Sequence, residues 1–438
     1  MLIVTGLFFN KKGNQSFYNS VKGYTKNYKV TILTAATLSS DVYLELKKVE
    51  KEVDRVKIIS VFPYKLFSLI SIFLSFFKRM KLKIFKAHNS LSDNNGKSDK
   101  DMMLVNMQPT FKSKFSFYLR SYLLAASGII YRCFNNVDVI CCYEINGCIA
   151  SVWLKKIFRI PVFIKLQGTA LGGQLDLIGN EKFNKVFSID IAEIKRSIIF
   201  DLAIMTNDGT RGDVVLKHYG FPVDKIFFLN NGIDSRFENA IKKSSPVFKN
   251  EKLKSINVCS VSRLTSWKRV DLILEVISEV RKIIEISYTL IGIGDEDESQ
   301  AILKLIKKLN LEGNVTFIRG ATTDEVIKVI SNSDFLISIN RFTNVSNPVF
   351  EALYIGVPVI TISQSEFSDV LGPGMESCLF VEDSDRVALI REVVDKITRI
   401  VPESYNALTK NTENFRNYFP TWEVRSDREL AKIARILE

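Results

Sequence analysis

Short, unbroken apolar runs alternate with helical patterns along the whole 438-residue chain. Most runs are continuous stretches of Val, Ile, Leu and Phe, which is typical of parallel strands that are covered on both faces. Helical patterns such as 270–282 and 324–331 lie between the runs, so each strand is expected to lead into a crossover helix. The predicted strands are 2–8, 30–35, 56–60, 137–143, 161–166, 202–206, 225–229, 256–262, 287–292, 314–318, 335–339, 357–362 and 377–381.

This pattern predicts an α/β fold with two doubly wound, Rossmann-like domains. A polar, charged stretch with one proline, residues 240–254, separates two strand–helix series and is interpreted as a linker. We expect a first domain over 1–240, a second over 250–400, and C-terminal helices over 401–438 that pack back toward the first domain. The polar stretch 87–110 is interpreted as a loop within the first domain.

Cysteine and histidine usage bears on the compartment and on metal binding. The six cysteines form no CxxC pair and have apolar neighbours, as at Cys141 and Cys142, which is typical of buried free thiols. We therefore expect a reducing, cytoplasmic compartment. Only two histidines are present, so a histidine-based metal site is not expected. Residues 1–6 lack a basic region and a cleavage site, and are interpreted as a first strand and not as a signal peptide.

The net charge of +12 favours anionic partners. Residues 55–92 contain eight Lys or Arg and no acid, and these bases bracket an apolar run at 66–77. This run is too short for the roughly 20 residues that span a bilayer. It can instead lie in the interface and attract anionic lipid, which predicts peripheral association with the inner face of the cell membrane. The alternative is a buried helix with solvated lysines.

Two cations follow the strand at 256–262, and ligands of doubly wound folds bind outside the carboxyl ends of strands. Arg263 offers a planar fork for phosphate oxygens and Lys268 offers a compact charge. A diphosphate leaving group needs positive charge where negative charge develops. The alternative is a solvated basic loop before a helix.

A helix is predicted to begin after the strand at 335–339. Ser346 and Asn347 precede Pro348, which suits a first helical turn. Free N–H groups there can receive an anion. Glu351, one turn further on, can accept hydrogen bonds from a ribose diol, or it can be an exposed acid in a favourable position on the helix dipole.

Glycines and a further arginine follow other strands. Gly292 and Gly294 form a Gly-x-Gly without the third glycine of a dinucleotide fingerprint, so no dinucleotide cofactor is expected. The adjacent acids at 295–297 open a helix, where acids are expected without a metal. Gly13 permits close backbone approach or forms an ordinary turn. Arg319 is at the end of a predicted strand. It can contact a ligand there, or it can be an ordinary surface residue.

Taken together, these segments resemble glycosyltransferase family 4. Arg263-Leu264-x3-Lys268 resembles the family's diphosphate clamp, and the run from Asn347 to Leu353, followed by 356–360, resembles its Glu-x7-Glu region. Further segments that resemble the family are Asn231-Gly232-Ile233-Asp234, Tyr143-Glu144-Ile145-Asn146-Gly147, Gln167-Gly168-Thr169 and residues 205–212.

Two positions depart from the family pattern. Thr343 stands where the first glutamate of the pair is expected, so only the second, Glu351, the family's ribose partner, is present. Gln167 stands where many members have a histidine near the sugar. An amide cannot shuttle a proton, although it can polarise a hydroxyl.

The resemblance implies the GT-B fold, in which two Rossmann-like domains face a cleft. It further implies a retaining glycosyltransferase that uses a nucleotide sugar, UDP favoured over GDP, without metal. The acceptor would be a saccharide, lipid-linked, in cell-surface polysaccharide assembly. The implied catalytic residues are Arg263, Lys268 and Gln167, and the implied donor-binding residues are Glu351, Asn347, Pro348, Ser346, Gly292, Gly294, Arg319 and Gly13.

Two other functions are compatible with parts of the pattern. A nucleotide-sugar epimerase would share the fold and the donor, but the scarcity of histidine argues against it. A basic nucleic-acid-binding protein would show basic clusters interleaved with aromatic residues. The basic clusters here flank apolar runs instead, so nucleic acid is not an expected partner.

Overall fold

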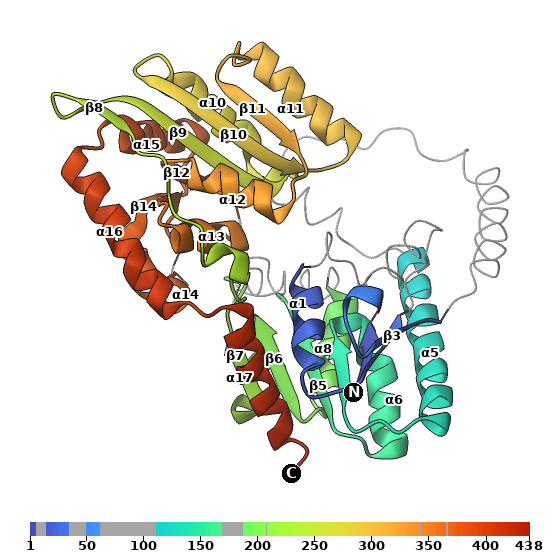
Figure 1. The fold of residues 1–438 in the computed structure, drawn as a ribbon. Coiled ribbons are helices and arrows are strands. Elements are labelled where there is room, and N and C mark those ends of the chain that lie inside the picture. Colours follow the sequence, from blue (N-terminus) through green and yellow to red (C-terminus); the bar gives the residue numbers. More distant parts are fainter. Residues whose placement is uncertain are drawn as a thin grey trace, which may run out of the picture. The chain divides into compact units, whose positions relative to one another are not determined.

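The structure of the protein is a computed structural model that contains two compact units (Figure 1). The first consists of Met1–Thr206, Arg211–Leu229 and Ser426–Glu438, and the second of Asn207–Thr210 and Asn230–Arg425. The residues that the structure describes are 1–5, 15–34, 50–61, 111–168, 187–206, 208–341, 343–364 and 367–438. Gly13, the predicted loop 87–110 and the apolar run 66–77 lie outside them.

The first unit is built on a seven-stranded sheet of order β3-β2-β1-β4-β5-β6-β7, in which every pair is parallel. Most strands are buried along their whole length because helices cover both faces, which is why they are continuous apolar runs. The strands are β1 (Leu2–Thr5), β2 (Val30–Thr34), β3 (Val56–Ser60), β4 (Ile140–Tyr143), β5 (Val162–Leu166), β6 (Leu202–Thr206) and β7 (Ile226–Leu229).

Two separate apolar cores lie on the two faces of this sheet. Side chains of α5, α6, α8 and α9 form one core, and side chains of α1 and α17 form the other. These helices are α1 (Gln15–Tyr24), α5 (Phe111–Phe134), α6 (Cys148–Phe158), α8 (Ser188–Ser197), α9 (Gly212–His218) and α17 (Trp422–Arg435), with 3-10 turns η1 (Ile145–Gly147) and η3 (Val223–Lys225). The last helix of the chain thus completes the core of the first unit.

The second unit has a sheet of order β11-β10-β9-β12-β13-β14, all parallel, and a short strand β8 that pairs antiparallel with β9. Helices again cover both faces and enclose two cores. The strands are β8 (Val247–Lys249), β9 (Lys252–Arg263), β10 (Glu285–Ile293), β11 (Val315–Arg319), β12 (Phe335–Ser338), β13 (Val359–Ile362) and β14 (Cys378–Val381).

The helices of the second unit follow the strands in the order expected for right-handed crossovers. Residues of α10, α11 and α15 form one core, residues of α13 and α14 the other, and α16 contributes to both. They are α10 (Val270–Val280), α11 (Glu296–Lys308), α12 (Thr323–Ser331), α13 (Asn347–Ile355), α14 (Phe367–Leu371), α15 (Arg386–Thr398) and α16 (Pro402–Tyr418), with 3-10 turns η4 (Ser235–Phe237), η5 (Ser266–Lys268) and η6 (Gly372–Ser377).

The predicted fold class, α/β with two doubly wound parallel sheets, is confirmed, and each predicted strand is present. The sequence did not predict β8, which lies inside the polar stretch 240–254 and within the second unit. Only one residue of β8, Phe248, packs against a core, so the strand has too little apolar character to be recognised.

Two further sequence expectations can be compared with the described residues. Five of the free cysteines are buried, but Cys133 is exposed, so the prediction of burial is wrong there. It lies in the last turn of α5 beside Phe134, which is 84% exposed, where that helix projects into solvent. Among the described helices, none combines the length and apolar character needed to cross a membrane.

Candidate donor and catalytic site

In the second sheet, strand order reverses beside β9, which lies between β10 and β12. Doubly wound folds bind ligands at the carboxyl ends of strands at such a point. Arg263 is the last residue of β9, and the loop after β12 leads into α13. The backbone N–H of Arg341 in that loop donates to the carbonyl of Trp267, 2.9 Å away. The two loops that carry the predicted donor residues are therefore joined.

Arg263 and Lys268 lie at the two ends of the turn that follows β9. The Arg263 guanidinium carbon is 5.9 Å from the ring centroid of Trp267, and the Lys268 Nζ is 4.2 Å from it. In the part of the chain that is described, neither cation has an acidic partner. Burial, with a smaller contribution from the charge of Arg263, lowers the pKa of Lys268 to about 8. Two like charges held together without a counter-ion make this turn suited to an anion.

Gly292, near the end of β10, and Gly294, just after it, pack against this turn. A Cβ at Gly292 would lie 2.6 Å from Cδ2 of Leu264, and one at Gly294 would lie 2.9 Å from Cβ of Leu264. The N–H of Leu264 also donates to the carbonyl of Ile293, at 2.9 Å. Because Gly292 and Gly294 have no side chain, the end of β10 can pack directly against Leu264, the residue that follows Arg263.

The acidic run after Gly294 caps a helix. The Asp295 carboxylate accepts from the N–H of Glu298 at 2.8 Å, and the Glu298 carboxylate accepts from the N–H of Asp295. No group of three metal-ligating side chains occurs among the described residues. Arg319, at the end of β11, is exposed and pairs with Glu296 at 2.8 Å.

The N-terminus of α13 is built as the sequence predicts, with Pro348 in its first turn and Ser346 as the N-cap. The Ser346 side chain makes no capping hydrogen bond within the described structure. The Nδ2 of Asn231 donates to Oδ1 of Asn347, at 3.0 Å. The Asn231–Asp234 motif and the predicted ribose-binding helix are therefore in direct contact.

Glu351 lies one turn inside α13 and is half-buried. Its pKa is raised to about 7, mainly by burial and to a smaller extent by the charge of Asp234, while the charge of Arg236 opposes both. Among the described residues no hydrogen-bond or ion-pair partner contacts its carboxylate. An unpaired, half-buried carboxylate of this kind can accept hydrogen bonds from a bound hydroxyl group.

Thr343 has a structural role at the position where a first glutamate was expected. Its Oγ1 donates to the backbone carbonyl of Asp208 at 2.7 Å, within the second unit, and accepts from the N–H of Val345 at 3.2 Å. Asn344 closes the loop, since its Oδ1 accepts from the N–H of Asn340 at 2.6 Å. The sequence did not predict this Asn340–Asn344 pairing.

In the first sheet, strand order reverses beside β1, which lies between β2 and β4. Gln167 follows β5, the neighbour of β4, and its Nε2 donates to the hydroxyl of Tyr143. Its backbone N–H donates to Oε1 of Glu144 at 2.8 Å. The sequence did not assign a role to Glu144, although a carboxylate directly after a buried strand was a usable signal.

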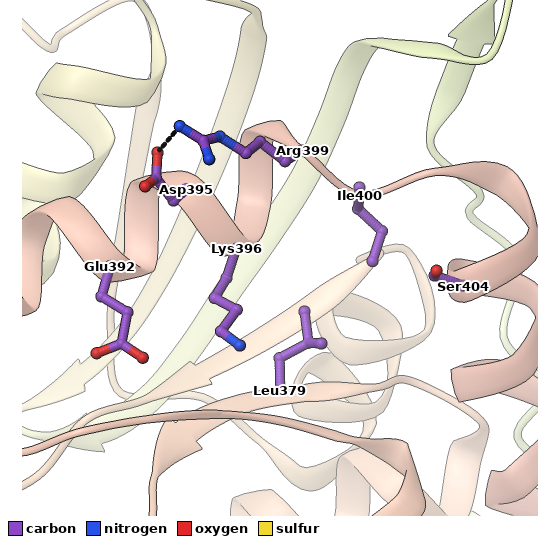
Figure 2. Close-up of a pocket in the computed structure, with 7 residues that line it drawn as sticks. All are labelled: Leu379, Glu392, Asp395, Lys396, Arg399, Ile400 and Ser404. Carbon is purple, nitrogen blue, oxygen red and sulfur yellow. Dashed lines mark ion pairs between the residues drawn. The ribbon is translucent and has the colours of Figure 1, made fainter.

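A separate hollow of about 420 Å³ lies on the second unit (Figure 2). Its lining residues include Leu379, near the amino end of β14, and Lys396 and Arg399 at the end of α15, with an Arg399–Asp395 pair at 3.3 Å. It thus lies at the amino ends of the strands and not at the carboxyl ends, where the predicted donor residues are.

Comparison with known proteins agrees with this arrangement. Residues 242–415 match the family of glycosyl transferases group 1. The match spans less than half of the 438-residue chain. The match includes Arg263, Lys268 and Glu351, so the predicted resemblance to glycosyltransferases is confirmed for the group 1 region, while family 4 in particular stays a prediction.

Two curated relatives are each 22% identical to the chain. N-acetyl-alpha-D-glucosaminyl L-malate synthase of Bacillus anthracis aligns over 55% of this chain and 60% of its own length. A phosphatidylinositol N-acetylglucosaminyltransferase component from Arabidopsis thaliana aligns over 58% of this chain and 54% of its own length. The chain thus matches less than two thirds of either relative.

Solved structures share the fold over the whole chain. Sucrose-phosphate synthase from Thermosynechococcus elongatus has a TM-score of 0.64 at 13% identity, covering 100% of this chain and 98% of that one. Anabaena Alr3699/HepE, in complex with UDP and glucose, has a TM-score of 0.63 at 13% identity, covering 99% and 98%. These structures confirm the GT-B fold class.

Proposed function

We propose that this protein is a retaining glycosyltransferase that moves a sugar from a nucleotide-sugar donor to a saccharide acceptor. The observation that carries the proposal is the pair of cations, Arg263 and Lys268, which lack an acidic partner in the described structure and lie where the strand order reverses. The match of residues 242–415 to the glycosyl transferases group 1 supports it.

The donor diphosphate binds at Arg263 and Lys268, where negative charge grows as the bond to the sugar breaks. Glu351 accepts hydrogen bonds from the ribose. The N-terminal turn of α13 faces the donor with the N–H groups of Ser346 and Asn347, and Pro348, which has no backbone N–H, fixes the first turn beside them. Gly292 and Gly294 support the turn that carries Arg263 and Lys268, and Arg319 lies toward the base. Gly13, which is outside the described residues, is proposed to approach the donor with its backbone.

Transfer proceeds on one face of the sugar. The bond from the anomeric carbon to the phosphate oxygen breaks, the acceptor oxygen forms the new bond, and the leaving phosphate takes the acceptor proton. Gln167 polarises a hydroxyl group through its amide. This scheme retains the anomeric configuration and assigns no step to a metal ion.

The donor is proposed to be a UDP-sugar and the acceptor a lipid-linked saccharide of cell-surface polysaccharide assembly. One fold neighbour was solved with UDP-glucose, which supports the uridine nucleotide. The basic, acid-free segment 55–92 supports a membrane-bound acceptor at the inner face of the cell membrane.

A thermal-shift screen with UDP, GDP and ADP tests the donor, because a ligand of the native state raises the melting temperature. We expect UDP to give the largest shift. Transfer is then followed by NMR with and without EDTA, and we expect a retained product under both conditions. An inverted product, or interconversion of the donor sugar without acceptor, would contradict the proposal, the latter in favour of an epimerase.

Membrane association is tested separately by sedimentation with phosphatidylglycerol vesicles. We expect binding at low ionic strength and release at high salt, because salt screens the attraction. Exchanging Lys78, Arg79, Lys81 and Lys83 for Gln should weaken vesicle binding and leave nucleotide affinity unchanged. Wild-type protein that stays in the supernatant at low salt would remove the support for a lipid-linked acceptor.

A further inference from the structure

Glu144 has an unusual backbone conformation for a residue with a side chain. Its φ is 59° and its ψ is 172°, a combination that is essentially restricted to glycine. It follows β4 directly, beside the point where the strand order of the first sheet reverses. A strained residue persists only where the surrounding structure holds it in place, and such residues cluster at active sites.

The neighbouring backbone holds this turn tightly. The N–H of Glu144 donates to the carbonyl of Lys165 at 2.9 Å, and its own carbonyl accepts from the N–H of Gly147 at 3.2 Å. A Cβ at Gly147 would lie 2.3 Å from the carbonyl oxygen of Val4. The turn after β4 is therefore pressed against β1 on one side and bonded to β5 on the other.

This conformation directs the Glu144 carboxylate to the segment that follows β5. Its Oε1 accepts from the backbone N–H of Gln167 at 2.8 Å. The preceding residue, Tyr143, accepts from the Gln167 side chain and is itself fully buried, with its ring centroid 4.3 Å from that of Phe17. Two consecutive residues of one strand end thus hold the main chain and the side chain of Gln167.

A glycine would adopt the same backbone without strain but would offer no acceptor to Gln167. The presence of a glutamate at this φ therefore indicates that its carboxylate is needed. We propose that Glu144 is a positioning residue, which fixes Gln167 for its action on a substrate hydroxyl group. This inference rests on the proposed glycosyltransferase function.

Replacing Glu144 by glycine separates positioning from a structural role. Glu144→Gly relieves strain, so its melting temperature should equal or exceed that of the wild type. Its kcat should fall by about 10-fold to 10²-fold, because misplaced groups lose rate, while the KM for the donor stays unchanged. Glu144→Gln keeps an acceptor oxygen and should restore most of kcat.

Arg159→Gly is the matched control. Arg159 also has a positive φ, 54°, in the first unit, but it ends α6 and is exposed. This variant should also keep its stability, and its kcat should match that of the wild type.

A Glu144→Gly protein with wild-type kcat would overturn the positioning role and leave the proposed function intact. A lower melting temperature in Glu144→Gly, with no rescue of kcat by Glu144→Gln, would also overturn it and show a purely structural residue. A wild-type protein that neither binds a nucleotide nor transfers a sugar would defeat the proposed function, and this inference with it.

Discussion

Lys165 in the first unit and Lys268 in the second both lie near the carboxyl end of a parallel strand, yet their surroundings differ. Lys165 is 1% exposed, and its Nζ lies 2.6 Å from Oε1 of Glu429, which is fully buried. Its Nζ also donates to the hydroxyl groups of Ser20 and Tyr24. Lys268 has an aromatic ring beside it and a second cation nearby, and no acid among the described residues.

The difference separates a structural cation from a binding one. A buried charge is tolerated when the protein supplies its counter-ion, and the pair then contributes to the fold alone. In a partly buried cation without a counter-ion, the charged form is destabilised, and this lowers the pKa of Lys268. A bound diphosphate would supply the missing negative charge. The comparison therefore assigns Lys165 to the core and supports the proposal that Lys268 binds the donor.

Removing the counter-ion of Lys165 should have the largest effect on stability. Glu429→Ala leaves a buried, unpaired charge, which should lower the free energy of unfolding by about 3–5 kcal/mol in urea denaturation. Asp427→Ala on the same helix is the control. It breaks only the exposed pair with Lys26, so the loss should stay below about 1 kcal/mol. Equal, small losses would show that Lys165 does not depend on Glu429.

Removing the cations of the second unit should act on turnover and not on folding. Arg263→Ala and Lys268→Ala should each reduce turnover by about 10²-fold or more, because the charge of the leaving diphosphate is no longer stabilised. Arg269→Ala is the control, since Arg269 lies in the same turn but pairs with Asp383 at 2.7 Å. Normal turnover in both site variants would show that the clamp assignment is wrong.

Glu351 extends the comparison to an acidic residue that has no partner in the described structure. Glu351→Gln keeps the size of the side chain but removes a charge-assisted acceptor, worth about 1.5–3 kcal/mol, which corresponds to about 10-fold to 10²-fold in nucleotide affinity. Calorimetry measures this change, with the exposed Glu376→Gln as control. If Glu351→Gln binds the nucleotide with unaltered affinity, Glu351 does not contact the ribose and only interacts favourably with the helix dipole.

The pH dependence of kcat/KM should be the smallest of these effects. The pKa of Glu351 is raised to about 7, so its charged form, which accepts from ribose, increases as pH rises through that value. The pKa of Lys268 is lowered to about 8, so its charge is lost as pH rises further. We expect a bell-shaped profile with a maximum between the two values.

Lys268→Arg tests the alkaline limb, because a guanidinium keeps its charge. This variant should lose the descending limb and keep the ascending one. If the descending limb is unchanged in Lys268→Arg, the titration of a group other than Lys268 causes that limb.

The sequence predicted the strands and the residues at their ends because both depend on local pattern. Continuous apolar runs located β9, and the residue after such a run, Arg263, is necessarily near the carboxyl end of the sheet. Pairings between distant residues have no local signal. Lys165 and Glu429 are 264 positions apart, and the strained φ of Glu144 depends on contacts with β1 and β5.

The central claim is that Arg263 and Lys268 bind the diphosphate of the donor, and calorimetry with the wild type and the Arg263→Ala/Lys268→Ala double variant tests it most directly. The ligands are the nucleoside diphosphate that gives the largest thermal shift and the same nucleoside without phosphates. We expect the double variant to lose at least about 10-fold in affinity for the diphosphate, since charge-assisted hydrogen bonds are removed, and to bind the nucleoside as the wild type does. Equal diphosphate affinity in the two proteins would contradict the claim.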